Sequence, residues 1–210
     1  MRATARLHRA SRRARRRYRG SRVVLALLLF LTLAASARVH GADDDTPRLP
    51  GTVVGVLDGD TVDVRLGSGM MRVRLHAIDT PERGQPYGDA AKDALSRLVF
   101  GKAVELEPYE QDRYDRLVAR IWMGELDVNA QMVRDGYAWA YRRYVDDVRY
   151  CIYEYDARQA RRGLWKAPRE QSVAPWEWRR RKTLEGRFTD YTNQSVAGCI
   201  SEVSVVGSVG

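Results

Sequence analysis

Between residues 61 and 77, apolar and polar side chains alternate, and this alternation constrains the fold more than any other feature of the sequence. In "TVDVRL" and again in "MRVRLHA" every second residue is apolar, which is typical of strands that bury one face. "GSG" at residues 67–69 separates the two runs, and Asp58-Gly59 before them is a strong signal for a two-residue hairpin turn. The sequence therefore predicts three consecutive antiparallel strands, starting near Gly51.

The apolar positions also predict a register for the second hairpin. If Leu66 faces Met71 across the turn, the apolar residues of both strands lie on one face, as they should. The same register places Asp60 beside Ala77, within two residues of Asp79. Two carboxylates that are distant in sequence are thereby brought to one end of the sheet.

Further along, helix-like and strand-like runs follow one another. Three segments have helical periodicity with a glycine at the end: residues 88–102, 127–136 and 146–163. In the third, Val148, Ile152 and Tyr155 form one apolar stripe, which we expect to be buried. Two strand-like runs cover residues 103–110 and 117–124. Five short strands with a helix after the third predict an α+β fold, a small closed β-barrel of the OB type.

The first 37 residues have the composition of an export signal. They hold 10 Arg and no acidic residue, and the apolar run Val23–Leu33 is short for a membrane span. Ala35–Ala37 fit the small-residue cleavage pattern, so we expect cleavage before Arg38, a secreted or periplasmic protein, and no stable membrane association afterwards. The alternatives are an uncleaved anchor or a basic arm that contacts nucleic acid.

The net charge of +9 comes from this segment alone. Of the 36 basic residues 10 lie in it, which leaves 26 against 27 acidic residues, a net charge of −1. Contact with nucleic acid must therefore come from a local cluster.

The rest of the chain divides into a linker (38–50), a folded domain (51–183) and a loosely ordered C-terminal tail (184–210), and we expect a monomer. Cys151 and Cys199 are predicted to form one disulfide in an exported protein, and two unpaired buried thiols are the alternative.

The acidic residues at the predicted sheet end suggest a metal site. Asp60 and Asp79 have no Cys and only one His, His76, close in sequence, which argues against zinc. Two carboxylates, a backbone carbonyl from Thr80 and waters suit a hard cation, calcium before magnesium. Glu82, three residues after Asp79, could orient or deprotonate an attacking water. The alternatives are two turn-capping aspartates and a loop glutamate that pairs with Arg83.

Arg74 and Arg116 are the candidates for stabilising the negative charge that develops on a phosphate. For Arg74, the alternative is an ordinary ion pair with Asp63, which the predicted register places opposite it. Residues 139–144 ("WAYRRY") and 175–182 ("PWEWRRRK") interleave aromatic residues with arginine. That composition suits base stacking beside phosphate contacts, or equally core tryptophans with solvated basic flanks.

Six motifs, in order, resemble the staphylococcal nuclease (thermonuclease) family over about residues 51–166. They are "DGDTV" (58–62), "RLHAIDTPE" (74–82), "YG" (87–88), "DRYDR" (112–116), "VNAQMVRDGYA" (128–138) and "ARRGLW" (160–165). The resemblance implies a five-stranded OB-type barrel with three helices that cleaves DNA and RNA with calcium. It also implies cleavage on the 5′ side of the phosphorus, which leaves 3′-phosphate ends.

The same resemblance implies roles for individual residues. The metal ligands would be Asp60, Asp79 and the carbonyl of Thr80; the catalytic residues would be Glu82, Arg74 and Arg116; and Tyr114, with Tyr141 and Tyr144, would contact the substrate. Two departures are visible: Asp115 stands where the family often has glycine, and the segment between Glu82 and Tyr87 is short.

We therefore expect an exported calcium-dependent endonuclease that acts on DNA, RNA or both. The alternatives are a non-catalytic OB module that binds single-stranded nucleic acid or protein, and a membrane-anchored scaffold. In a degenerate module the acidic and arginine positions would be lost, and here they are filled.

Overall fold

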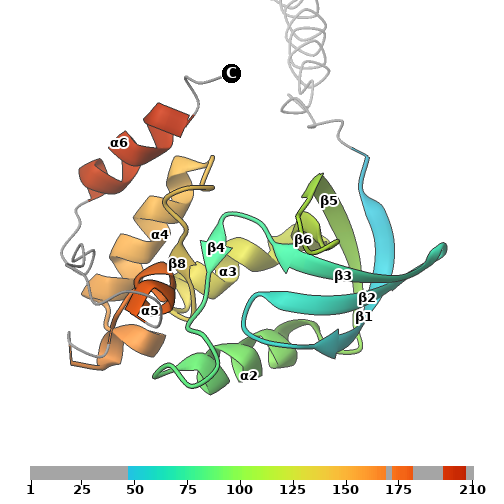
Figure 1. Cartoon of the computed structure of the whole chain (residues 1–210), viewed down its shortest axis with the longest axis horizontal. Coiled ribbons are helices and arrows are strands. Elements are labelled where there is room, and N and C mark those ends of the chain that lie inside the picture. The colour runs from blue at the N-terminus through green and yellow to red at the C-terminus, as the bar shows by residue number, and fades with distance from the viewer. Residues whose placement is uncertain (1–46, 169–171, 182–195, 207–210) are drawn as a thin grey trace, which may run out of the picture. The chain divides into compact units, whose positions relative to one another are not determined.

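The structure is a computed structural model that describes residues 47–168, 172–181 and 196–206, all within the unit Thr46–Gly210. A closed five-stranded barrel forms the centre of this unit. The strands lie in the order β3-β2-β1-β5-β6, and a parallel pairing of β3 with β6 closes the barrel (Figure 1). They are β1 (Leu49–Val56), β2 (Thr61–Leu66), β3 (Gly69–Leu75), β5 (Ala103–Gln111) and β6 (Leu117–Met123). The predicted OB-type α+β fold is confirmed.

Three short strands extend this frame. β7 (Leu126–Asp127) pairs with the end of β6, while β4 (Ile78–Asp79) and β8 (Trp139–Ala140) form a separate two-stranded sheet. In that antiparallel sheet Asp79 lies opposite Trp139, so the segment that follows β8 runs beside the segment that precedes β4, and the N–H of Tyr141 donates to the carbonyl of Ala77.

The register of the β2–β3 hairpin differs from the predicted one by two residues. Leu66 pairs with Gly69 instead of Met71, and Arg74 pairs with Thr61. The turn is tighter than expected, because the chain reverses within Gly67 and Ser68. A shift of two residues preserves the face on which each side chain lies, so the buried side of the hairpin was predicted correctly.

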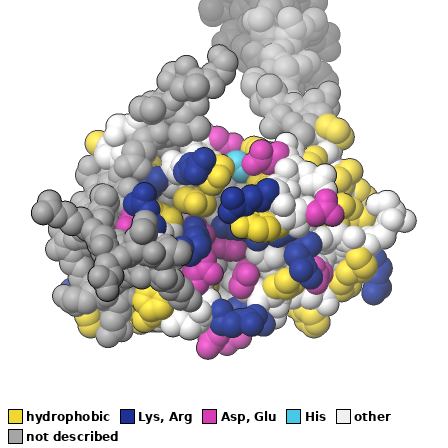
Figure 2. All heavy atoms as spheres, in the orientation of Figure 1, with side chains coloured by type: hydrophobic (Ala, Val, Ile, Leu, Met, Phe, Trp, Pro, Cys, Tyr) yellow, Lys and Arg dark blue, Asp and Glu magenta, His cyan; other side chains and the backbone are white. Residues whose placement is uncertain are grey.

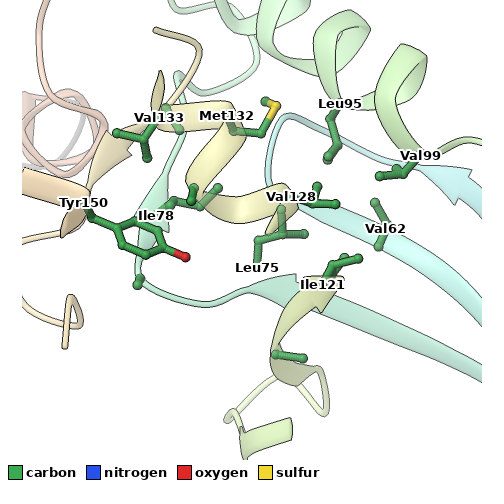
Figure 3. Close-up of a cluster of buried hydrophobic side chains, with 14 of the residues drawn as sticks. Val62, Leu75, Ile78, Leu95, Val99, Ile121, Val128, Met132, Val133 and Tyr150 are labelled. Carbon is green, nitrogen blue, oxygen red and sulfur yellow. The ribbon is translucent and has the colours of Figure 1, made fainter. Parts of the chain in front are cut away.

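The predicted helices are present, with further ones after them: α2 (Gly88–Val99), α3 (Val128–Arg134), α4 (Val148–Gln159), a 3-10 turn η1 (Gly163–Lys166), α5 (Pro175–Arg181) and α6 (Val196–Val206). Gly101 and Gly136 follow α2 and α3 with φ of 73° and 75°, the left-handed conformation of a helix stop. The core joins the inner barrel face to α2 and α3, as Leu75, Leu95 and Met132 illustrate (Figure 3).

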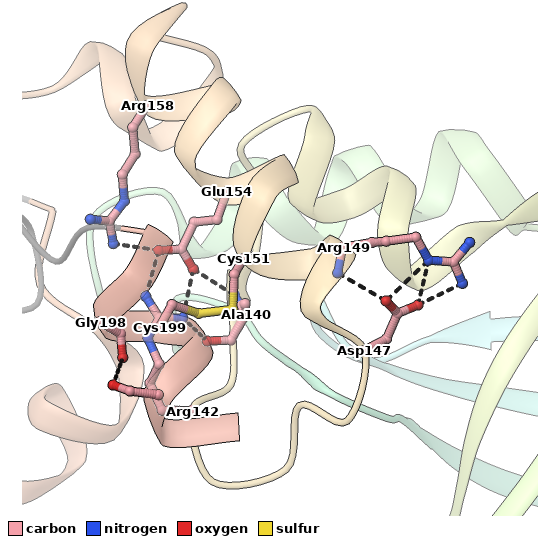
Figure 4. Close-up of a disulfide and its surroundings, with 10 residues drawn as sticks. Ala140, Arg142, Asp147, Arg149, Cys151, Glu154, Arg158, Gly198 and Cys199 are labelled. Atoms are coloured by element: carbon pink, nitrogen blue, oxygen red, sulfur yellow. Dashed lines mark hydrogen bonds and ion pairs between the residues drawn. A yellow bond between two sulfur atoms is a disulfide. The ribbon is translucent and has the colours of Figure 1, made fainter. Parts of the chain in front are cut away.

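The buried face of α4 is not the predicted one. Val148, Ile152 and Tyr155 are about 40% exposed, whereas Glu154 is buried together with Tyr150. Glu154 is stabilised there by Arg142 and Arg158, whose guanidinium groups lie 2.7 and 2.5 Å from Glu154 Oε1 (Figure 4). The helix therefore packs through a buried ion-pair network, which apolar periodicity does not detect.

The predicted disulfide is confirmed. Cys151 on α4 is bonded to Cys199 on α6 (Figure 4). We expected residues 184–210 to be a loosely ordered tail, but Val196–Val206 form a helix that the disulfide ties to α4. The predicted signal (1–37), most of the linker and residues 184–195 lie outside the described residues. Among the residues described, no helix is long and apolar enough to cross a membrane.

Candidate active site

Asp60 lies in the short loop between β1 and β2 and is 6% exposed. Its Oδ2 accepts hydrogen bonds from the backbone N–H and the hydroxyl of Thr80, each over 2.8 Å. The loop can approach Thr80 this closely because residue 59 is glycine: a Cβ there would lie 2.7 Å from Thr80 Oγ1 and 2.8 Å from Ala91 Cβ. The "DGD" motif is thus packed directly against the "DTPE" motif.

Arg74 joins the two carboxylates predicted to bind metal. Its Nε lies 3.3 Å from Asp60 Oδ1, and its Nη2 lies 3.1 Å from Asp79 Oδ1. The alternative of an ordinary pair with Asp63 is wrong, because Asp63 pairs with Arg72 at 2.9 Å. Asp60 lies just before the first residue of β2, so the alternation of faces along the hairpin does not keep its side chain apart from Arg74.

Asp79, on β4, is the most deeply buried carboxylate of the site, at 1% exposed. Burial raises its pKa to about 6, against the opposing charge of Arg74 and the hydrogen bonds from Arg179. Burial lowers the pKa of Arg74, but the charges of Asp60 and Asp79 outweigh it, so the net shift is upward. The site therefore holds negative charge at a high cost in desolvation.

Asp58 is a further acidic residue that the sequence interpretation treated only as part of a turn. Its Oδ1 accepts from the backbone N–H of Asp60 over 3.1 Å. Burial raises the pKa of Asp58 to about 6, and the charge of Asp60 adds to the shift. The carboxylate of Asp58 beside Asp60 thus adds negative charge that a bound cation would relieve.

Glu82 lies in a loop that its neighbours hold firmly. Its backbone N–H donates to Gln85 Oε1 over 3.0 Å, and its carbonyl accepts from the N–H of Gln85. Gly88, from the "YG" motif, packs so close that a Cβ there would overlap the Glu82 carbonyl oxygen. The side chain of Glu82 is 37% exposed and accepts from Arg179 Nη1 over 2.5 Å.

Arg116 is held by Asp112 and not by its neighbour Asp115. Asp112 accepts from Arg116 Nε over 2.8 Å and from its backbone N–H over 3.0 Å. Asp115 has a φ of 62°, a left-handed conformation in which glycine is favoured and aspartate is tolerated. This left-handed backbone explains why glycine is frequent in the family at this position. The carboxylate of Asp115 accepts a hydrogen bond from the side chain of Gln111.

The aromatic residues fall into two groups. Tyr114 is 64% exposed, with the guanidinium of Arg116 5.4 Å from its ring. Tyr141 and Tyr144 pack edge to face at 5.0 Å, and the hydroxyl of Tyr141 accepts from Arg179 Nη2, which also donates to Asp79. Trp139, by contrast, is fully buried. The core interpretation of "WAYRRY" thus holds for Trp139, and base stacking on Tyr141 and Tyr144 stays a prediction.

All nine predicted site residues line one open cleft of about 670 Å³. They are Asp60, Arg74, Asp79, Thr80, Glu82, Tyr114, Arg116, Tyr141 and Tyr144. Asp58, Arg143 and Arg179 also line it, and none of these three was assigned a role from the sequence. On the face shown in Figure 2, acidic and basic side chains are intermingled and do not form one basic patch, as the balanced charge of the domain predicts.

The oxygen atoms of this cleft suit a hard divalent cation. Asp60 and Asp79 are both buried and converge on one guanidinium, and His76, which also lines the cleft, pairs with Asp146. Within the described part of the chain no cluster of three or more His, Cys, Asp or Glu side chains has metal-binding geometry. The ligand set of Asp60, Asp79 and the Thr80 carbonyl, with water, stays a prediction.

Comparison with known proteins places this geometry in a family. The family described as "Staphylococcal nuclease homologue" matches residues 72–167. An "Uncharacterized endonuclease" of Escherichia coli is 37% identical over 161 residues, which cover 76% of this chain and 97% of the relative. A "Micrococcal nuclease" of Shigella flexneri is 42% identical over 141 residues, which cover 62% of this chain and 80% of the relative. "Protein ParB" of Escherichia coli is 40% identical over 158 residues, which cover 70% of this chain and 88% of the relative.

Proposed function

Since the chain belongs to the staphylococcal nuclease family, we propose that it is a calcium-dependent endonuclease that hydrolyses the phosphodiester bonds of DNA, RNA or both. One observation carries the proposal: the acidic residues, the arginines and the tyrosines selected from four separate segments of the sequence (58–62, 74–82, 112–116 and 139–144) all line a single cleft. If the aspartates only capped turns and the arginines only formed surface ion pairs, we would not expect these side chains to line the same cleft.

The chemistry assigns a separate task to each group. Asp60, Asp79 and the Thr80 carbonyl would hold the calcium ion, which when bound supplies positive charge against the phosphate. Glu82 accepts a proton from the attacking water as the water oxygen bonds to phosphorus. Arg74 and Arg116 donate to the phosphate oxygens, on which negative charge builds.

The products follow from the direction of attack. The bond between phosphorus and the 5′-oxygen breaks, and that oxygen leaves with the bonding electrons and takes up a proton. The phosphate stays on the 3′ side. Tyr114, exposed at the rim of the cleft, offers a surface on which a base can stack.

The test is digestion of plasmid DNA and of RNA with calcium and then with a chelator, followed by analysis of the product ends. We expect cleavage that stops with the chelator and leaves 3′-phosphates. Binding of single-stranded nucleic acid with no cleavage would favour the non-catalytic OB module instead.

Export is also part of the proposal. The disulfide between Cys151 and Cys199 supports it, because such bonds persist in oxidising compartments. The predicted mature protein begins at Arg38, is a monomer and does not stay on the membrane. Intact-mass measurement of the exported protein tests this, and retention of residues 1–37 would contradict it.

A further inference from the structure

We propose that Arg179 is the built-in counterion of the cation-binding carboxylates, and that a divalent cation displaces it from Asp79 on binding. The inference rests on the proposed function, because it takes Asp79 as a ligand of the cation. Arg179 lies outside the six motifs that carry the family resemblance, and its position in the cleft is visible only in the folded chain.

The contacts of Arg179 join both acidic parts of the site. Its Nη2 lies 2.7 Å from Asp79 Oδ2 and its Nη1 lies 3.2 Å from Asp79 Oδ1, a two-pronged pair. The same Nη1 donates to Glu82 Oε1 over 2.5 Å. One guanidinium therefore neutralises both the proposed ligand and the proposed general base.

The helix that carries Arg179 is anchored to the site by other residues. Trp176 stacks on Tyr141 with ring centroids 5.3 Å apart and planes 7° apart. Gln85 donates to the carbonyl of Val173 over 2.7 Å while its Oε1 accepts from Glu82. The segment before Arg179 is thus fixed to the Glu82 loop, and this packing places the backbone of Arg179 within reach of Asp79.

Asp79 cannot serve a cation and both arginines without a change. Its Oδ1 already accepts from Arg74 and Arg179, and its Oδ2 accepts from Arg179. These three bonds use most of the roughly four lone-pair sites of a carboxylate, and a cation bound at Asp79 would repel the two guanidinium groups.

Of the two arginines, Arg179 is the one that can leave. The side chain of Arg74 is 13% exposed and also contacts Asp60 and the carbonyl of Leu75. The side chain of Arg179 is 41% exposed and lies at the cleft wall, so it can turn toward solvent at little cost in burial. By linkage, the Arg179–Asp79 contact must weaken cation binding by the same factor by which the cation weakens the contact.

The test is calorimetric titration of calcium chloride into the full exported protein and its variants. We expect Arg179→Ala to bind calcium more tightly, by at least about fivefold, the lower end of typical coupling between two sites. The calcium affinity of Arg179→Lys should lie between those of Arg179→Ala and the unaltered protein, because lysine keeps the charge and loses the two-pronged contact. Arg180→Ala is the matched control: it removes the same charge from the same helix, at a residue that pairs with Glu177.

The direction of the change decides the outcome. A residue that merely supported the fold, or that oriented Asp79 for the metal, would give weaker binding when removed. If the unaltered protein binds calcium and Arg179→Ala binds it equally or less tightly, this inference is overturned and the proposed function stands. If neither protein binds calcium, the proposed calcium site fails and the inference fails with it.

Discussion

Thr80 donates both its backbone N–H and its hydroxyl to one oxygen of Asp60, over 2.8 Å in each case. Because Thr80 directly follows Asp79, this pair of bonds fixes the two carboxylates relative to each other. The carboxylate spacing, on which cation binding depends, is thus set by a residue that the sequence suggested only as a carbonyl ligand.

We predict that Thr80→Val lowers the free energy of unfolding by about 1–3 kcal/mol, because a buried carboxylate loses one donor. The cost should nearly vanish in an Asp60→Ala background, where the acceptor is absent. Chemical denaturation of the four proteins of this double-mutant cycle measures both effects. Thr80→Ser, which keeps the hydroxyl, is the control. An equal cost in both backgrounds would mean that the Thr80 hydroxyl stabilises the fold through a partner other than Asp60.

Arg116 should matter for turnover far more than for stability. Asp112 holds its guanidinium at the cleft wall, where it can donate to a phosphate. Arg116→Ala is expected to reduce turnover by at least about 10²–10³, the usual cost of one preorganised donor. Arg116→Lys should recover little of it. Arg72→Ala is the control, because Arg72 pairs with Asp63 outside the cleft. Its turnover should be close to that of the unaltered protein. Near-native turnover of Arg116→Ala would remove Arg116 from the mechanism.

Asp115→Gly tests why aspartate is tolerated beside Arg116. Glycine fits the φ of 62° without a Cβ clash, and the partner of Arg116 is Asp112. We therefore expect turnover to stay within about twofold and the melting temperature to change little, as for other surface substitutions. A large rise in turnover would show that the charge of Asp115 restrains Arg116.

Acid sensitivity should depend on Glu154. Burial raises the pKa of Glu154, but the charges of Arg142 and Arg158 outweigh it and hold the pKa below the ordinary value of 4.5. A lowered pKa gives stability that is complete above 4.5 and is lost as the pH falls through the folded-state value.

We predict that Glu154→Gln is less stable than the unaltered protein by about 3–5 kcal/mol at pH 7, because it leaves buried arginines without their counterion. The difference should narrow as the pH falls below 4.5. Denaturation at a series of pH values measures it, with Asp93→Asn on the exposed side of α2 as the control. A difference that is the same at every pH would exclude the ion pair as its cause.

Much of the frame followed from local patterns. Alternation predicted the hairpin faces, and glycines predicted the ends of α2 and α3, because these signals depend on neighbours in sequence. The exact register did not follow, since Leu66 could face either Met71 or Gly69 with the same faces buried. Only the length of the turn separates the two registers.

The remaining errors concern long-range contacts. Glu154 is buried because arginines on other segments neutralise it, which an apolar stripe cannot reveal. Arg179 reaches Asp79 across 100 residues of sequence, through the packing of Trp176 on Tyr141. The sequence offered "PWEWRRRK" as a possible contact segment, but it could not say which arginine enters the cleft.

The most direct test of the account is calcium titration of Asp60→Asn and Asp79→Asn, with Asp63→Asn as a control carboxylate on the same hairpin. The account predicts that both site variants lose calcium binding together with turnover, and that Asp63→Asn, whose partner is Arg72, keeps both. Unchanged calcium binding in the two site variants, with only a lower melting temperature, would contradict it and leave these aspartates as structural turn residues.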